Sequence, residues 1–238
     1  MLTRPRLQEF ACAGATVVRL KGGDPLVFGR GGEESDYLRS RGIDVAVSPG
    51  ITAAAGIAAE LGIPLTHRGV ANSVRFLTGH SREGGEEPAE AVAALGANAD
   101  AATTLVLYMG LATLPALSAA LREAGLDART PAVAVERGTT REQRRVFARL
   151  GGVAAATRAA GLASPTLVIV GHVVALSPLW PFQKQEGAED AYELQEGPAR
   201  AELPPGDGDD AGTEFITLPG GERLALPWPR HLQAMRSD

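Results

Sequence analysis

Short apolar runs alternate with longer stretches rich in alanine and leucine between Leu2 and Pro178. The short runs carry β-branched residues and end in Gly, Pro, Ser or Thr, which is typical of strands followed by loops. The pattern predicts strands at Thr16–Leu20, Val45–Val47, Val74–Thr78, Thr104–Tyr108, Ala132–Glu136 and Thr166–Val170. It predicts helices at Pro5–Ala13, Glu33–Arg41, Ala53–Leu61, Pro88–Leu95, Leu114–Ala124 and Gly152–Ala160. Such alternation indicates an α/β fold with a largely parallel sheet.

One pair of extended runs breaks this alternation. Pro131–Glu136 and Gln143–Arg149 are joined by Arg-Gly-Thr-Thr-Arg-Glu, with no helix between them. A parallel pair needs a long crossover, whereas antiparallel strands can be joined by a short turn. We therefore expect antiparallel pairing late in the domain, in a sheet that is mostly parallel at first and then mixed.

The character of the chain changes after Pro178. Residues 183–238 contain 12 acidic and five basic residues, and the stretch 183–212 has little apolar side chain to bury. We predict an α/β domain over 1–182, an acidic disordered linker over 183–212 and a tail over 213–238. In the tail, two apolar runs flank Pro219-Gly-Gly, which favours a β-hairpin.

Charge and composition exclude several classes of protein. Residues 1–182 carry 18 basic and 16 acidic residues, which argues against a nucleic-acid-binding surface. The single cysteine, Cys12, excludes an internal disulfide framework and a cysteine-based zinc cluster. No apolar run approaches the roughly 18 residues of a membrane-spanning helix, and Met1–Arg6 lacks the apolar region of a secretory signal. The expectation is a cytoplasmic protein, or a protein of the plastid stroma in a photosynthetic eukaryote.

The most informative stretch runs from Arg19 to Glu34. Five glycines fall between Gly22 and Gly32, and glycine lets backbone groups approach a ligand without a Cβ in the way. Asp24 stands at the carboxyl end of a predicted strand, where open α/β sheets bind ligands. The spacing matches neither the dinucleotide fingerprint nor the P-loop. A turn that merely joins strand to helix is the alternative, but charged residues interleaved with the glycines favour a ligand loop.

Two further stretches carry polar chemistry. In Ser48–Ala55, Thr52 either caps a helix or belongs to a helix N-terminus kept open to a ligand by small residues. In Leu65–Arg82, five basic residues gather around a short strand, namely His67, Arg68, Arg75, His80 and Arg82. No histidine pair has helical metal-ligand spacing, so no metal site is predicted. The basic residues form either a solvated loop or a cluster that faces a polycarboxylate.

Together and in this order, the motifs resemble the tetrapyrrole methylase family from about Gln8 to about Leu179. The resemblance rests on Val18-Arg-Leu-Lys-Gly-Gly-Asp-Pro, Phe28-Gly-Arg-Gly-Gly-Glu-Glu, Pro49-Gly-Ile-Thr-Ala, Gly62-Ile-Pro-Leu-Thr-His-Arg-Gly, Thr78-Gly-His, Tyr108-Met-Gly, Glu136-Arg-Gly-Thr-Thr and Ser164-Pro with Ile169-Val-Gly. The long glycine motif points to members that methylate uroporphyrinogen III rather than later corrinoid intermediates.

The resemblance implies S-adenosylmethionine as methyl donor, uroporphyrinogen III as acceptor and precorrin-2 as product, on the way to sirohaem or cobalamin. It implies a homodimer, with the donor held between two α/β subdomains. The donor-binding positions carried over are Gly22, Gly23, Asp24, Val27, Thr52, Ala53, Met109, Gly138 and Thr166. The counter-charges available to the eight carboxylates of the acceptor are Arg19, Lys21, Arg30, His67, Arg68 and Arg75.

The sequence departs from the family pattern at its start. Members normally open with a Gly-Pro-Gly-Asp-Pro loop and about two strand–helix units that precede the segment beginning here at Met1. We therefore expect an N-terminally shortened member, with its first strand or strands missing and no catalytic base identified. The resemblance implies that the missing part supplies the acidic residue that assists proton removal. If the chain methylates without that part, Asp24 and Glu136 are the first candidates for the base, because both are carboxylates at predicted strand ends. The alternatives are a non-catalytic remnant that dimerises or binds tetrapyrrole, and a sibling methyltransferase of corrinoid precursors.

Overall fold

A computed structural model describes residues 3–79, 97, 99–182, 192–196, 213–217 and 223–227. The chain divides into two units, Met1–Ala199 and Arg200–Asp238, which are described separately. The helices of the first unit are α1 (Thr3–Cys12), α2 (Gly31–Arg39), α3 (Ala53–Glu60), α5 (Leu114–Glu123), α6 (Val153–Ala159) and the 3₁₀ helix η1 (His172–Leu176). Its strands are β1 (Ser73–Thr78), β2 (Thr103–Tyr108), β3 (Pro131–Glu136), β4 (Arg144–Arg149), β5 (Thr166–Val170) and β6 (Tyr192–Glu196).

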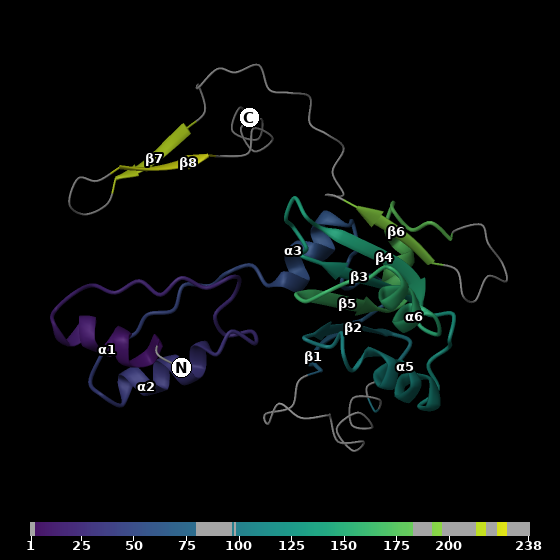
Figure 1. The fold of residues 1–238 in the computed structure, drawn as a ribbon, viewed down its shortest axis with the longest axis horizontal. Coiled ribbons are helices and arrows are strands. Elements are labelled where there is room, and N and C mark those ends of the chain that lie inside the picture. Colours follow the sequence, from purple (N-terminus) through teal and green to yellow (C-terminus); the bar gives the residue numbers. More distant parts are fainter. Residues whose placement is uncertain are drawn as a thin grey trace. The chain divides into compact units, whose positions relative to one another are not determined.

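The six strands form one mixed sheet in the order β1-β2-β5-β3-β4-β6 (Figure 1). β1 and β2 pair in parallel, and every other described pair in this sheet is antiparallel. The predicted antiparallel partnership of β3 and β4 is confirmed, with Pro131 opposite Arg149 and Glu136 opposite Arg144. The α/β fold with a mixed sheet is therefore confirmed. The expectation of a largely parallel sheet is wrong for the described strands, because β5 lies between β2 and β3 and pairs antiparallel with both.

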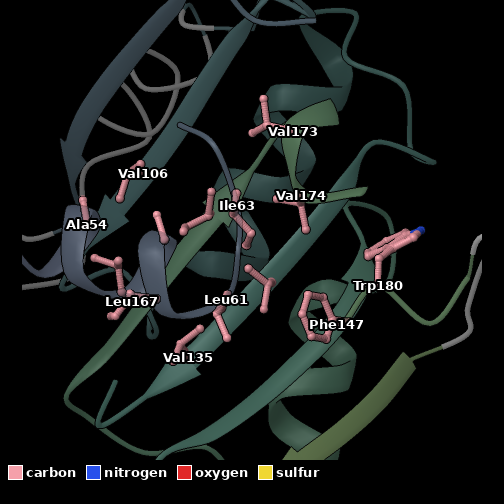
Figure 2. Close-up of a cluster of buried hydrophobic side chains, with 14 of the residues drawn as sticks. Ala54, Leu61, Ile63, Val106, Val135, Phe147, Leu167, Val173, Val174 and Trp180 are labelled. Carbon is pink, nitrogen blue, oxygen red and sulfur yellow. The ribbon is translucent and has the colours of Figure 1, made fainter. Parts of the chain in front are cut away.

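Helices cover both faces of the sheet, so its central strands are buried on both sides. Successive residues of a strand point to opposite faces. Val133 and Val135 of β3 accordingly belong to one core cluster, and Ala132 and Ala134 to the other. The first cluster contains residues of α3 and η1 together with Phe147, Trp180 and Phe182 (Figure 2). The second is built with the leucines of α5 and the small residues of α6.

Local sequence signals account for the helix ends. Thr52 caps α3, because its hydroxyl accepts a hydrogen bond from the Ala55 N–H at 3.1 Å. After the C-terminal end of α5, Gly125 has φ +104°, and the Leu126 N–H donates to the Leu121 carbonyl at 3.0 Å. This is the glycine-terminated ending expected where the chain must leave a helix through a left-handed residue.

Two predicted strands are wrong. Thr16–Leu20 and Val45–Val47 have no regular secondary structure and pair with no strand among the described residues. The side chains of Val18 and Leu20 are 77% and 80% exposed. β-branched residues favour a strand through packing against neighbouring strands, and these segments lack such neighbours in the described chain. The predicted helix at Pro88–Leu95 lies outside the described residues.

β6 and a hairpin occupy parts of the chain after Phe182. The sequence does not predict β6, which lies within the stretch assigned to a linker and pairs antiparallel with β4. In the second unit, β7 (Thr213–Thr217) and β8 (Arg223–Pro227) pair antiparallel, as the apolar runs predict. The turn at Pro219 and most of 183–212 lie outside the described residues, so the three-part division stays a prediction.

Candidate functional site

The glycine-rich loop folds back on itself between Lys21 and the start of α2. The Gly31 N–H donates to the Pro25 carbonyl at 2.9 Å. A Cβ added at Gly29 would lie 2.6 Å from that carbonyl oxygen, so the close backbone approach requires glycine there. Gly22, in contrast, is exposed, and a Cβ at this position would meet no described atom within 4 Å. The backbone of the loop is therefore closely packed at Gly29 and Gly31, whereas at Gly22 it leaves room for another group.

Asp24 joins this loop to the loop that precedes α3. One carboxylate oxygen accepts from the Leu26 N–H at 2.8 Å and the other from the Gly50 N–H at 3.1 Å. These hydrogen bonds, that from Leu26 above all, hold the pKa of the Asp24 carboxyl below its ordinary value. The ionised Asp24 carboxylate thus joins the two loops, and we call its hydrogen bonds from Leu26 and Gly50 the Asp24 brace. Both of its oxygens already have backbone donors.

The two loops also touch through their backbones. A Cβ at Gly50 would lie 2.8 Å from the Gly23 carbonyl oxygen, and a Cβ at Gly23 would lie 3.2 Å from the Ile51 carbonyl oxygen. Gly23 has φ +118°, a conformation that side chains oppose. The Ile51 side chain is 73% exposed beside this contact, immediately before Thr52 and Ala53. The structure therefore places Gly23 and Asp24 against the loop of Gly50 and Ile51, which leads directly into Thr52 and α3.

Tyr108 connects both loops to the sheet. It ends β2, and its hydroxyl oxygen accepts from the Ala54 N–H in the first turn of α3 at 3.0 Å. Its ring lies 4.8 Å from the ring of Phe28 in the glycine-rich loop, and 5.9 Å from the ring of Phe76 on β1. The following residue, Met109, has φ +51° and is half exposed. The carboxyl end of β2 thus lies beside the glycine-rich loop and α3.

The turn after β3 also contacts α3. A Cβ at Gly138 would collide with the Ile57 side chain, so α3 packs directly on this turn. The Arg137 N–H donates to the Pro165 carbonyl at 3.0 Å, which ties the turn to the start of β5. Thr166 lies opposite Glu136 in the sheet, and its buried hydroxyl donates to the Ala163 carbonyl. Thr166 is therefore largely buried at the start of β5, beside the strand end that leads into the turn of Gly138.

Three of the predicted counter-charges are paired with α2. Lys21 lies 3.0 Å from one carboxylate oxygen of Glu34, and Arg19 lies 3.6 Å from the other. Arg30 forms an exposed ion pair with Glu33 at 3.4 Å. A polycarboxylate that binds here would have to compete with Glu33 and Glu34 for these cations.

The remaining counter-charges lie on or just before β1. His67 bridges to Ala71, and its Nδ1 is 3.0 Å from the Arg68 carbonyl oxygen. The side chains of His67, Arg68 and Arg75 are exposed. Hydrogen bonds from the Thr103 hydroxyl and the Ala102 N–H, with a smaller effect of the Arg75 charge, lower the pKa of Asp100. His80 and Arg82 lie outside the described residues.

Glu136, the second candidate base, is 7% exposed and already engaged. Its Oε2 accepts from the Ala163 N–H at 3.1 Å and from the Arg144 guanidinium at 3.4 Å. It serves to hold the strand ends together.

Within the described ranges, no group of three or more His, Cys, Asp and Glu side chains could hold a metal ion, and no described helix is long and apolar enough to cross a membrane.

Sequence reasoning missed the residues that connect the site. Tyr108 belongs to the Tyr-Met-Gly motif, but only Met109 of this motif is predicted to bind the donor. Glu34 likewise stands in the glycine motif, and its pairing with Lys21 and Arg19 could have been expected from opposite charges on one loop and the helix it enters. The contacts of Phe28 and Ile51 had no signal in the spacing.

A family model of the tetrapyrrole (corrin/porphyrin) methylases matches residues 5–154, which include both loops, α3 and the Tyr-Met-Gly motif. The chain belongs to this family. The resemblance inferred from the motifs is therefore confirmed, and the exposed loops and basic residues described above are those of a tetrapyrrole methylase.

Relatives of this tetrapyrrole methylase include named enzymes. Over 182 residues it is 66% identical to an S-adenosyl-L-methionine-dependent uroporphyrinogen III methyltransferase, chloroplastic, of Arabidopsis thaliana, covering 76% of this chain and 48% of that protein. Over 171 residues it is 49% identical to a sirohaem synthase of Pseudomonas aeruginosa, covering 71% of this chain and 36% of that protein. The chain thus spans about half the length, or less, of the curated relatives it matches.

Among solved structures, the chain resembles the uroporphyrin-III C-methyltransferase of Thermus thermophilus complexed with S-adenosyl homocysteine. The TM-score is 0.61 at 39% sequence identity, over 73% of this chain and 70% of that chain. The mixed sheet and its helical layers are therefore those of a known methyltransferase fold.

Proposed function

We propose that this tetrapyrrole methylase takes part in the S-adenosylmethionine-dependent C-methylation of uroporphyrinogen III to precorrin-2, in sirohaem or cobalamin synthesis. The observation that carries the proposal is the 66% identity to the Arabidopsis enzyme over 182 residues, which cover 76% of this chain. The acceptor and the donor are those named for the relatives, and the site described above has the chemistry to suit both.

The first loop and the start of α3 fit the donor. Gly22 leaves open space over the backbone, and two apolar side chains of the neighbouring segments are exposed, those of Ile51 and Met109. When bound, S-adenosylmethionine supplies a methyl group on a sulfonium. Apolar walls and backbone carbonyls hold such a cation without strongly stabilising it, which suits a reaction in which its charge disappears. The residues proposed to line this site are Gly22, Gly23, Asp24, Val27, Thr52, Ala53, Met109, Gly138 and Thr166.

The first turn of α3 acts on the donor mainly by its shape. The N–H groups of Ala54 and Ala55 are already bonded, to Tyr108 and to Thr52. The helix start is therefore fixed in place before any ligand arrives. Positioning of two reactants is a large part of the barrier in a methyl transfer, so a prearranged wall is a direct contribution to the rate.

The basic residues fit the acceptor. Arginine binds carboxylates through two parallel hydrogen bonds, and Arg68 and Arg75 present exposed guanidinium groups beside β1. Arg30 and Arg19 are paired with Glu33 and Glu34, so a carboxylate of the acceptor would have to replace these partners. Neither Asp24 nor Glu136 is an obvious proton acceptor, because donors already surround both carboxylates.

Two finer points belong to the same proposal. A homodimer is expected from the family resemblance, and equilibrium sedimentation tests it. The name of the Arabidopsis relative includes a chloroplast location, which favours a plastid over a bacterial cytoplasm for this protein. Fractionation of cells that express a tagged version distinguishes the two compartments.

The experiment is a methyl-transfer assay with labelled S-adenosylmethionine and uroporphyrinogen III. Two proteins are compared: the 238-residue chain, and a chimera in which the opening segment of the Arabidopsis relative precedes Met1. We expect turnover by the chimera at the least. If the chimera folds and binds S-adenosylmethionine but transfers no methyl group, the proposal fails. A chimera that binds tetrapyrrole and no donor would favour the non-catalytic alternative.

A further inference from the structure

Gln143 is a buried amide beside the turn that joins β3 to β4. It is 0% exposed, whereas glutamine is mostly found at protein surfaces. Its Oε1 accepts a hydrogen bond from the Thr139 N–H at 2.7 Å, and its Nε2 donates to Oε1 of Glu60 at 3.1 Å. Glu60 is the last residue of α3. One side chain, to which the function proposed above assigns no role, therefore links the turn to the end of that helix.

The turn itself has an uncommon backbone. Arg137 and Thr139 have φ +46° and +67°, a left-handed conformation that is rare for residues with a side chain and rarest for those branched at Cβ, such as threonine. Such residues persist only where the surrounding structure holds them. The Arg137 carbonyl accepts from the Thr140 N–H at 3.2 Å and from the Thr140 hydroxyl at 2.7 Å. The Thr139 N–H donates to Gln143, which is thus one of the groups that fix the turn.

The turn packs against α3 at two positions. A Cβ added at Gly138 would collide with the Ile57 side chain. A Cβ added at Gly56 would lie 3.5 Å from the Thr139 methyl group and 3.7 Å from a methyl group of Ile51. Three segments therefore meet at the small residue Gly56: the turn after β3, α3 itself and the loop that precedes α3.

Polar side chains hold α3 at both of its ends. At its start, the Tyr108 hydroxyl oxygen accepts from the Ala54 N–H at 3.0 Å. At its end, Glu60 accepts from Gln143. The first turn of α3 and Gly138 are both assigned to the methyl donor above. Gln143 thus fixes, relative to each other, the two elements that carry these groups.

We propose that Gln143 is a positioning residue for S-adenosylmethionine, which holds the turn of Gly138 against α3 so that the two walls of the donor site keep their separation. The inference rests on the proposed function, because it takes the donor site from there. A side chain without exposed surface does not touch the donor, so Gln143 acts through the Thr139 amide and through α3. The position needs an acceptor toward the turn and a donor toward Glu60, and an amide side chain supplies both.

Four variants of the chimera described above, which contains the full chain, test this role. Gln143→Met keeps an unbranched side chain and removes both hydrogen bonds. Gln143→Glu keeps an acceptor for the Thr139 N–H but places a second carboxylate against Glu60. Glu60→Gln alone keeps an oxygen that accepts from Gln143. Gln143→Glu combined with Glu60→Gln reverses the pair, so that an amide again faces a carboxylate and Thr139 keeps its acceptor.

Calorimetric titration measures the affinity for S-adenosylmethionine at a temperature at which every variant is folded. We expect Gln143→Met and Gln143→Glu each to lower the affinity about tenfold. Glu60→Gln and the reversed pair should stay within about threefold of the unaltered chimera.

Ser118→Ala is the matched control for a loss of stability. Its hydroxyl is also buried and donates to the Leu150 carbonyl at 2.6 Å, which belongs to the second core cluster. Removing this hydroxyl should lower the thermal midpoint and leave the affinity for the donor unchanged. An affinity that falls in Ser118→Ala as far as in Gln143→Met would show that Gln143 contributes to stability alone, and the positioning role would be wrong.

Two further results would overturn the positioning role: a Gln143→Met variant that binds the donor as tightly as the unaltered chimera, or a reversed pair that binds no better than Gln143→Glu. Should Gln143→Met fail to fold, the comparison of Gln143→Glu with the reversed pair decides. The methyl-transfer assay separates this role from the proposed function. Donor binding that depends on Gln143 without methyl transfer contradicts the proposed function alone, whereas methyl transfer with equal donor affinity in all variants contradicts the positioning role alone.

Discussion

The central strands and the segment 15–52 are stabilised in different ways. Every residue of β3 is buried, and the strand is hydrogen-bonded to β4 on one side and β5 on the other. In the segment 15–52, Val18 and Leu20 are exposed, and the loops are held by individual contacts such as the Asp24 hydrogen bond from Gly50 and the ring contact of Phe28 with Tyr108. A change in the strands should therefore affect the whole unit, whereas a change in the loops should affect the ligand site and little else.

Phe147→Ala should have the largest effect. Phe147 is fully buried in β4 and packs edge-on against Trp180 at 5.9 Å. Truncating a buried phenylalanine costs about 3–5 kcal/mol of unfolding free energy. Val18→Ala, on a side chain that is 77% exposed, should stay within about 0.5 kcal/mol. Urea denaturation followed by circular dichroism measures both; equal losses would remove the contrast between the two regions.

The sequence predicts the first region well and the second poorly, for a physical reason. Val74–Thr78, Thr104–Tyr108, Ala132–Glu136 and Thr166–Val170 are confirmed as strands because their apolar residues pack on helices and on each other. Thr16–Leu20 has the same composition, but composition does not reveal whether a partner strand stands beside it. β6 was missed for the opposite reason, since an edge strand in an acidic stretch forms through backbone pairing with β4.

The site shows the same limit. Glycine density and charge identified the first loop, and the order of motifs identified the family. The side-chain contacts that assemble the loops are long-range: Asp24 reaches Gly50, and Tyr108 reaches Ala54 and Phe28. Spacing along one chain carries no information about such contacts, so the assigned binding residues remain predictions that variants must test.

Asp24→Ala should weaken binding of S-adenosylmethionine about tenfold, because the loop loses charge-assisted hydrogen bonds to its own backbone and to Gly50. Global unfolding should change little. Asp36→Ala, an exposed aspartate of α2, is the matched control. Calorimetric titration of the chimera measures the affinity; an unchanged value would contradict the brace that joins the two loops.

The same brace predicts a pH dependence. The pKa of folded Asp24 lies below the ordinary value of 3.8, so its bonds stabilise the folded loops above that value. This stabilisation is lost as the pH falls through the lowered pKa. The affinity for S-adenosylmethionine should therefore not change with pH through Asp24 above pH 3.8 and should fall as the pH drops below that value, and this step should be absent in Asp24→Ala. A step shared by both proteins would assign it to another group.

Tyr108→Phe should have a smaller effect. The change removes the acceptor of the Ala54 N–H and keeps the ring contact with Phe28. The unfolding free energy should fall by about 0.5–1.5 kcal/mol, with a few-fold loss of affinity for S-adenosylmethionine. Tyr37→Phe, which removes a hydroxyl bonded to Gln8, is the control away from the site. Equal affinities in the two variants would mean that the start of α3 does not depend on Tyr108.

Removal of the second unit should have the smallest effect. Arg200–Asp238 forms its own unit, so a chain that ends at Ala199 should keep its thermal midpoint within about 2 °C. A chain that ends at Phe182 also loses β6, and with it the Gln195 side chain that accepts from Arg145 at 2.8 Å. Arg145 is 6% exposed, and losing one acceptor of a buried cation costs about 1–3 kcal/mol, or several degrees. The pair of truncations therefore assigns the stability of this part of the chain to β6. If the chains that end at Phe182 and at Ala199 have the same thermal midpoint, β6 contributes nothing to the stability of the sheet. If the chain that ends at Ala199 already has a midpoint lower by many degrees than the full chain, the hairpin of β7 and β8 stabilises the rest of the protein.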